Sequence, residues 1–278
     1  MKLDMTTIYI DSRFRTANSK SETDFNIELP RSFNVPDGVV AHIDDIVVPV
    51  SWSTIDERNN IGYVNFYILN TQLHKVFTFE TKNYDGTTFA TAVQQRLTEA
   101  VVGFKHNGIP VVPVFSCVYE PLENILTISI TEDPDAAFTG FKMQFFTDEK
   151  LRTTYTQPEP NSINTIIGNT KETFITASSP YKCYLDLFGT RNLYLTSSAL
   201  CSYDTVSNFG MDTIIKKIPC TASYNKMIFQ SLGSTLDGLD VSKRTLRFLD
   251  FKLVDSSFRT IPLRGNHFSF SIVFQQKR

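Results

Sequence analysis

The chain has 278 residues, of which 41% are hydrophobic and 20% charged, and its formal net charge is −2. This charge balance lacks the basic excess of nucleic-acid-binding modules, so we expect no specific nucleic-acid partner. No apolar run approaches the roughly 20 residues of a membrane-spanning helix, and the sequence at the N-terminus has no signal-peptide core.

The four cysteines are widely spaced, and no two of them form a CxxC pair. A zinc cluster therefore has little support. Each cysteine stands among apolar or small residues, which is typical of reduced, packed thiols. We expect a protein made in a reducing compartment, inside the cell and not secreted, without disulfides. The cysteines are Cys117, Cys183, Cys201 and Cys220.

Alternation of apolar and polar residues predicts strands from the N-terminus onward. In "TDFNIELP", Phe25, Ile27 and Leu29 share one face, and Pro30 ends the strand. A turn is expected at Pro36, Asp37 and Gly38. The next predicted strands cover 39–52, 62–69 and 75–82.

Only one segment, "DGTTFATAVQQRLTEAVVGF", shows a helical period. Thr87 or Thr88 is suited to cap its start, and Gly103 is placed to end it. The stripe that the helix would bury consists of Phe89, Val93, Leu97 and Val101.

The remaining predicted elements are again strands. "VFSCVY" and "ILTISI" form a hairpin, and "FKMQFFT" follows as a strand before a looser region at about 153–180. Strands resume at Tyr181 and continue to a final strand whose inward face consists of Phe268, Phe270, Ile272 and Phe274. About ten short strands with a single helix predict an all-β sandwich or jelly roll.

The sequence contains none of the common catalytic motifs: GxGxxG, a P-loop, GxSxG and HExxH are absent. Asp44 and Asp45 are adjacent in a strand and face opposite ways, so they do not form a catalytic pair. Asp133 and Asp135 are typical of a turn rather than a calcium loop. The histidines lack ligand spacing. We therefore expect no enzyme, no cofactor and no catalytic or metal-binding residues.

The stretch "IYIDSRFRT" combines apolar residues with alternating charges. Its charged groups have two interpretations. In the first, Asp11 forms an ion pair within the chain, with Arg13 or Arg15. Alternatively, Ile8 and Ile10 add a strand to a neighbouring subunit, and the guanidinium groups bind its carboxylates.

The order of segments resembles the minor capsid, or penton, proteins of Polinton elements and virophages. "YIDSRFRT" followed by "SETDFNIELP" is similar to their "IDSRDR…F.I.L" opening, although Phe14 replaces the second aspartate. The later order "LDLFGTRNLYLTSSAL", "IIKKIPC", "KMIF" and "TLRFLDFKLVDSSFRTIPLRGNHFSFSIVF" also resembles this family.

The resemblance implies a single jelly roll formed by residues 1–70 and 181–278, with 71–180 as an inserted, mainly-β domain that carries the one helix. It implies a structural capsid protein, located in the virion, that assembles as a homopentamer at the icosahedral vertices and contacts the major capsid protein. The insertion would face outward, toward a possible host receptor. Assembly contacts would then involve Ile8, Ile10, Asp11, Arg13 and Arg15.

Two other functions remain open from the sequence. The first is a β-sandwich module of a virus surface that binds a glycan or receptor, with Trp52, Tyr63, Tyr67 or the insertion as its contact surface. The second and weaker one is an enzyme on a β-sandwich scaffold, in which Asp44 or His42 would be required.

Overall fold

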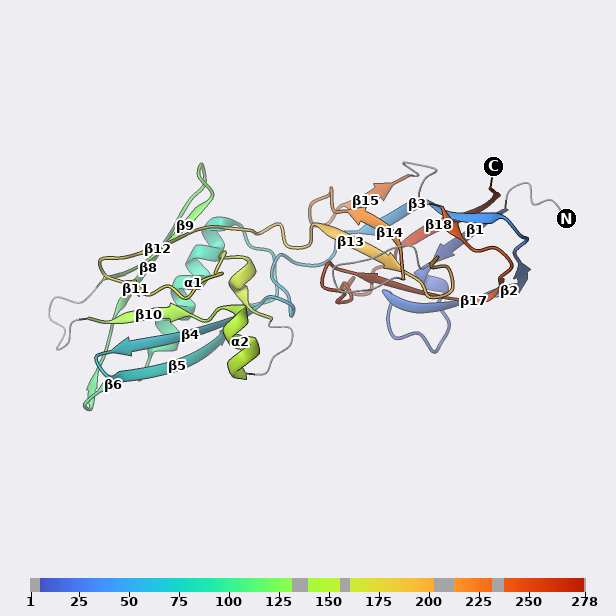
Figure 1. Cartoon of the computed structure of the whole chain (residues 1–278). Coiled ribbons are helices and arrows are strands. Elements are labelled where there is room, and N and C mark those ends of the chain that lie inside the picture. The colour runs from blue at the N-terminus through green and yellow to red at the C-terminus, as the bar shows by residue number, and fades with distance from the viewer. Residues whose placement is uncertain (1–5, 132–139, 156–160, 203–212, 232–237, 278) are drawn as a thin grey trace. The chain divides into compact units, whose positions relative to one another are not determined.

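The computed structural model describes residues 6–131, 140–155, 161–202, 213–231 and 238–277, so Asp133 and Asp135 lie outside the described residues. The chain forms two compact units (Figure 1). Unit 1 consists of residues 1–52 and 190–278, and unit 2 of residues 53–189. These boundaries differ from 70/71 and 180/181, because strands β4 (Ile61–Ile68) and β12 (Tyr181–Tyr184) pair within unit 2.

Unit 1 contains two antiparallel sheets. The order of the first is β1-β18-β3-β15, with β16 also paired to β3, and the order of the second is β14-β13-β17-β2. Their strands are β1 (Thr6–Asp11), β2 (Asp24–Asn34), β3 (Val39–Pro49), β13 (Asn192–Thr196), β14 (Ile214–Pro219), β15 (Met227–Gln230), β16 (Leu239–Asp240), β17 (Thr245–Val254) and β18 (Ser269–Gln276).

The pairing order in unit 1 is that of a jelly roll. When its eight main strands are lettered B to I in chain order, the first sheet reads B-I-D-G and the second reads C-H-E-F. These two four-stranded orders define the double-sheet jelly roll. The predicted all-β jelly-roll class is therefore confirmed. Unit 2 occupies the connection between strands D and E, which are β3 and β13.

The core of unit 1 is built from aromatic side chains of both sheets. Phe25 of β2 lies 5.6 Å from Phe268, ring centroid to ring centroid, and Phe251 of β17 lies 4.9 Å from Phe270 of β18. All four rings are at most 3% exposed. Edge-to-face packing of this kind stabilises a core beyond the burial of apolar area alone. The predicted inward face of the last strand is confirmed by the burial of Phe268, Phe270, Ile272 and Phe274.

Strand β17 departs from simple alternation. Simple alternation along 245–254 predicts Leu246 and Phe248 on one face, but the register against β2 shifts between these two residues. Leu246 is therefore buried, whereas Phe248 is 62% exposed. A bulge of this kind moves one residue out of the alternating pattern, and only the pairing partner reveals it.

Unit 2 contains two larger sheets and one short hairpin, all antiparallel. The order of the first sheet is β11-β10-β4-β5, the order of the second is β12-β9-β8, and β6 pairs with β7. Their further strands are β5 (Thr71–Thr78), β6 (Lys105–His106), β7 (Ile109–Pro110), β8 (Val114–Glu120), β9 (Ile125–Thr131), β10 (Lys142–Phe145) and β11 (Ile175–Thr176). The hairpin predicted from "VFSCVY" and "ILTISI" is β8 and β9.

Helix α1 (Gly86–Val101) is the helix that the sequence predicts. Its N-cap is Asp85 rather than a threonine, and Asp85 and Thr88 form a reciprocal capping box. Gly103 follows the helix with φ +81°, a conformation that glycine adopts without strain. The predicted stripe of Phe89, Val93, Leu97 and Val101 is buried.

A second helix, α2 (Asp148–Tyr155), follows β10 and overlaps only the first residues of the looser region predicted at about 153–180, so the expectation of a single helix is wrong. Its buried apolar residue is Leu151, which packs with Tyr63 and Phe146. Polar contacts hold its start, because Asp148 accepts hydrogen bonds from Ser162 Oγ at 2.5 Å and Asn164 Nδ2 at 2.6 Å. Short 3-10 turns cover Ser12–Phe14 (η1) and Ile163–Thr165 (η2).

Two phenylalanines of β17 provide a matched test of this core. Replacing buried Phe251 by alanine (Phe251→Ala) leaves a cavity between the sheets and is expected to lower the free energy of unfolding by about 3–5 kcal/mol. Phe248→Ala, on the same strand but exposed, is expected to change it by about 0.5 kcal/mol or less. Urea unfolding followed by tryptophan fluorescence measures both. Equal losses in the two variants would contradict this packing.

Candidate assembly surfaces

Strand β1 carries the apolar part of "IYIDSRFRT" and belongs to the jelly roll itself. It pairs with β18, with Ile8 opposite Ile272 and Ile10 opposite Phe270. Ile10 is 2% exposed and lies in the core, and partly buried Ile8 packs against the same core. Tyr9, between them, points the other way and is 82% exposed.

Ser12 joins the end of β1 by hydrogen bonds to Phe268, the residue that precedes β18. Its backbone N–H donates to the carbonyl of Phe268 at 3.0 Å, and its Oγ accepts the N–H of Phe268 at 3.1 Å. The hydroxyl also lies 3.2 Å from Nδ1 of His267. Ser12 is fully buried, so these bonds are shielded from water.

Asp11 and Arg13 form an ion pair within the chain. Arg13 Nη2 lies 2.6 Å from Asp11 Oδ2, and Arg13 Nε lies 3.0 Å from the same oxygen. The hydrogen bond from Arg13 holds the pKa of the Asp11 carboxyl below its ordinary value. Arg15 instead donates from Nη1 to the carbonyl of Ser12 at 3.1 Å. Of the two expected intrachain pairs, the one with Arg13 is therefore present.

Large apolar side chains are exposed at both ends of the first sheet. We use the name β1 patch for two residues at one edge, Tyr9 of β1 and Phe14 of the turn that follows it, and Phe14 is 77% exposed. At the other end, Met227 and Phe229 form the β15 patch, with exposed fractions of 59% and 66%. Large apolar side chains exposed at a sheet edge are candidates for a protein contact surface.

Tyr9, Met227 and Phe229 lie on edge strands, and Phe14 lies in the turn that follows β1. β1 and β15 are the two outermost strands of their sheet, and within the described ranges no strand pairs with the outer edge of either. Such edges can accept a strand of another chain. Sequence reasoning did not identify these patches as contact residues. Alternation was the signal that could have shown these side chains to face outward. Tyr9 stands between two inward isoleucines, and Phe229 follows inward Ile228.

The residues considered for catalysis have structural partners. His42 is 1% exposed, and its Nε2 lies 2.7 Å from Nε2 of Gln275. Asp45 is hydrogen-bonded to Ser271. Burial raises the pKa of the Cys117 and Cys183 thiols to about 12, so both remain protonated and weakly nucleophilic at neutral pH. Among the residues that the structure describes, no cluster of acidic, histidine or cysteine side chains is arranged to hold a metal.

Two of the aromatic residues considered for glycan stacking are inside the protein. Trp52 and Tyr63 are each 6% exposed, so neither offers a ring face to a ligand. Tyr67 is partly buried, and its hydroxyl accepts a hydrogen bond from Asn65 at 3.1 Å. All four cysteines are free thiols, as expected. No helix in the described part of the chain is long and apolar enough to cross a membrane.

The roles of Ser12 and Asp11 are separable by substitution. Ser12→Ala leaves the buried N–H of Phe268 without its side-chain acceptor and is expected to lower the free energy of unfolding by about 1–3 kcal/mol. Asp11→Asn weakens a solvent-exposed pair and is expected to cost less. Hydrogen exchange of the β1 amides, together with urea unfolding, measures both changes. A larger loss of β1 protection in Asp11→Asn would refute this ranking.

Comparison with known proteins supports the fold at the level of structure. No family model matches the sequence, and no curated protein matches it either. Among solved structures, the mavirus penton protein matches with a TM-score of 0.50 and 12% sequence identity. The match covers 97% of this chain and 99% of that chain. At this identity the likeness concerns the fold, and the chain therefore has a fold similar to that of the mavirus penton protein.

Proposed function

We propose that this protein is a structural component of a virus capsid, a penton that occupies the icosahedral vertices as a homopentamer and contacts the major capsid protein. The fold shared with the mavirus penton protein over nearly the whole of both chains is the observation that supports this most directly. The protein is then located in the virion, and its role is structural rather than catalytic.

The two exposed patches support a ring. A closed ring of identical subunits requires a head-to-tail interface in which two different surfaces of one subunit meet those of its neighbours. The β1 patch and the β15 patch support such an interface, because they lie at opposite edges of one sheet. Burial of each large apolar side chain contributes about 1.5–3 kcal/mol to such an interface.

The residues at the end of β1 have distinct places in this proposal. Ile10 supports the strand from the core, and Ile8 packs beside it. Arg13 has a 63% exposed side chain, so its guanidinium group remains accessible to an acceptor on a neighbouring subunit while it holds Asp11. Arg15 is bonded to the carbonyl of Ser12 and fixes the turn that presents Phe14.

Native mass spectrometry and electron microscopy of the purified protein test the oligomer. The wild-type chain is expected to form five-membered rings. The variants Tyr9→Ser/Phe14→Ser and Met227→Ser/Phe229→Ser each lose one patch and are expected to be monomers. Leu122→Ser, which changes a side chain that is 96% exposed in unit 2, is the matched control and is expected to leave the ring intact.

A mixture of the two patch variants tests the head-to-tail geometry. Each variant retains one intact patch, so an equimolar mixture has one complete interface per pair and is expected to give heterodimers without rings. If the β1 patch instead paired with itself, each single variant would behave independently of the other, and no heterodimer would form. Rings that persist in either double variant would show that these patches do not form the interface.

A further inference from the structure

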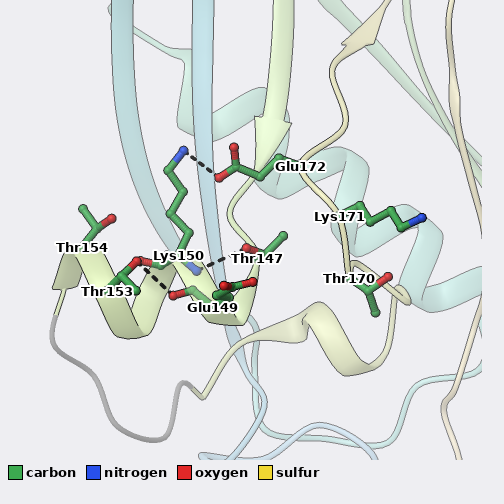
Figure 2. A pocket seen from close by; sticks show the side chains of 8 residues that line it. All are labelled: Thr147, Glu149, Lys150, Thr153, Thr154, Thr170, Lys171 and Glu172. Carbon is green, nitrogen blue, oxygen red and sulfur yellow. Dashed lines mark hydrogen bonds and ion pairs between the residues drawn. The ribbon is translucent and has the colours of Figure 1, made fainter.

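Unit 2 has a surface hollow of about 590 Å³ between helix α2 and the segment at 170–172 (Figure 2). A volume of this size lies within the range of small-molecule sites. The residues that line it are all hydroxyl-bearing or charged: Thr147, Glu149, Lys150, Thr153, Thr154, Thr170, Lys171 and Glu172.

The two walls of the hollow are fixed to each other by buried polar groups. The side-chain amides of Asn164 and Asn169 both donate to the carbonyl of Phe146, at 2.7 Å and 3.1 Å. Asn164 also donates to Asp148, the first residue of α2. Thr147 Oγ1 accepts the N–H of Lys150 at 3.2 Å. Such bonds hold the two segments that carry the lining residues in place before a ligand arrives.

Several lining groups have unused hydrogen-bonding capacity. The side chains of Glu149, Thr154, Thr170 and Lys171 form no hydrogen bond or ion pair with another described residue. Lys150 is held across the hollow by Glu172, at 2.7 Å, and lies 5.0 Å from the centroid of the Phe146 ring. Figure 2 shows this ion pair bridging from α2 to the opposite segment.

The composition of the lining indicates the class of ligand. Two lysines and two glutamates balance in charge, so the hollow favours neither an anion nor a cation. The absence of apolar side chains from this lining disfavours an apolar ligand. Carboxylates accept, ammonium groups donate, and threonine hydroxyls do both. A molecule with many hydroxyl groups, each of which donates and accepts, matches this set.

We propose that the hollow between α2 and residues 170–172 binds a neutral glycan through hexose or N-acetylhexosamine hydroxyls. This activity goes beyond the capsid role and does not depend on it, because every lining residue lies in unit 2.

A glycan array tests the proposal with the full chain. The array carries neutral hexose and N-acetylhexosamine glycans beside sialylated and sulfated ones, and the wild-type protein is expected to bind members of the neutral set. The double variant Thr154→Val/Thr170→Val removes one hydroxyl from each wall with little change in volume. It is expected to weaken binding at least tenfold. Glu172→Gln, which removes the charge that holds Lys150, is expected to weaken it as well.

Thr98→Val is the matched control, because Thr98 is an exposed helical threonine on α1, away from the lining. It is expected to bind as the wild type does. Unchanged thermal unfolding of each variant separates loss of the site from loss of the fold. Three results would overturn the proposal: no neutral glycan bound by the wild type, binding of anionic glycans alone, or full binding by both the double variant and Glu172→Gln.

Discussion

The jelly roll depends on the antiparallel pairing of β18 with strands from the beginning of the chain. β18 lies between β1 and β3, and its inward side chains reach across to the second sheet, where Phe270 packs against Phe251. One strand thereby fixes both the order within a sheet and the stacking of the two sheets. β1 and β15 are outermost because β18 and β3 occupy the interior of the sheet.

Local patterns predicted the elements whose stability comes from a buried apolar face. Helix α1 and the final strand are of this kind, since a regular stripe or alternation marks each of them. Helix α2 has no such stripe: it buries Leu151 and is held by the bonds of Asp148 to Ser162 and Asn164. Periodicity does not detect a helix that polar contacts from a later segment stabilise.

Prediction of the candidate assembly surfaces and of the unit boundaries requires knowledge of long-range strand pairing. Alternation shows that Tyr9 faces away from Ile10, yet it does not show whether its strand is interior or at an edge. Whether a strand is interior or at an edge depends on which strands pair with it, and β1 pairs with β18, the last strand of the described chain. Likewise β4 alternates as the jelly-roll strands do, and its pairing with β5 and β10 places it in unit 2.

The location of unit 2 between β3 and β13 has a consequence for how this protein diverges. Unit 2 is one uninterrupted stretch of chain with its own hydrophobic core, and all eight jelly-roll strands lie outside it. Its sequence can therefore vary, or be exchanged for another fold, while the jelly roll of unit 1 keeps its strand order.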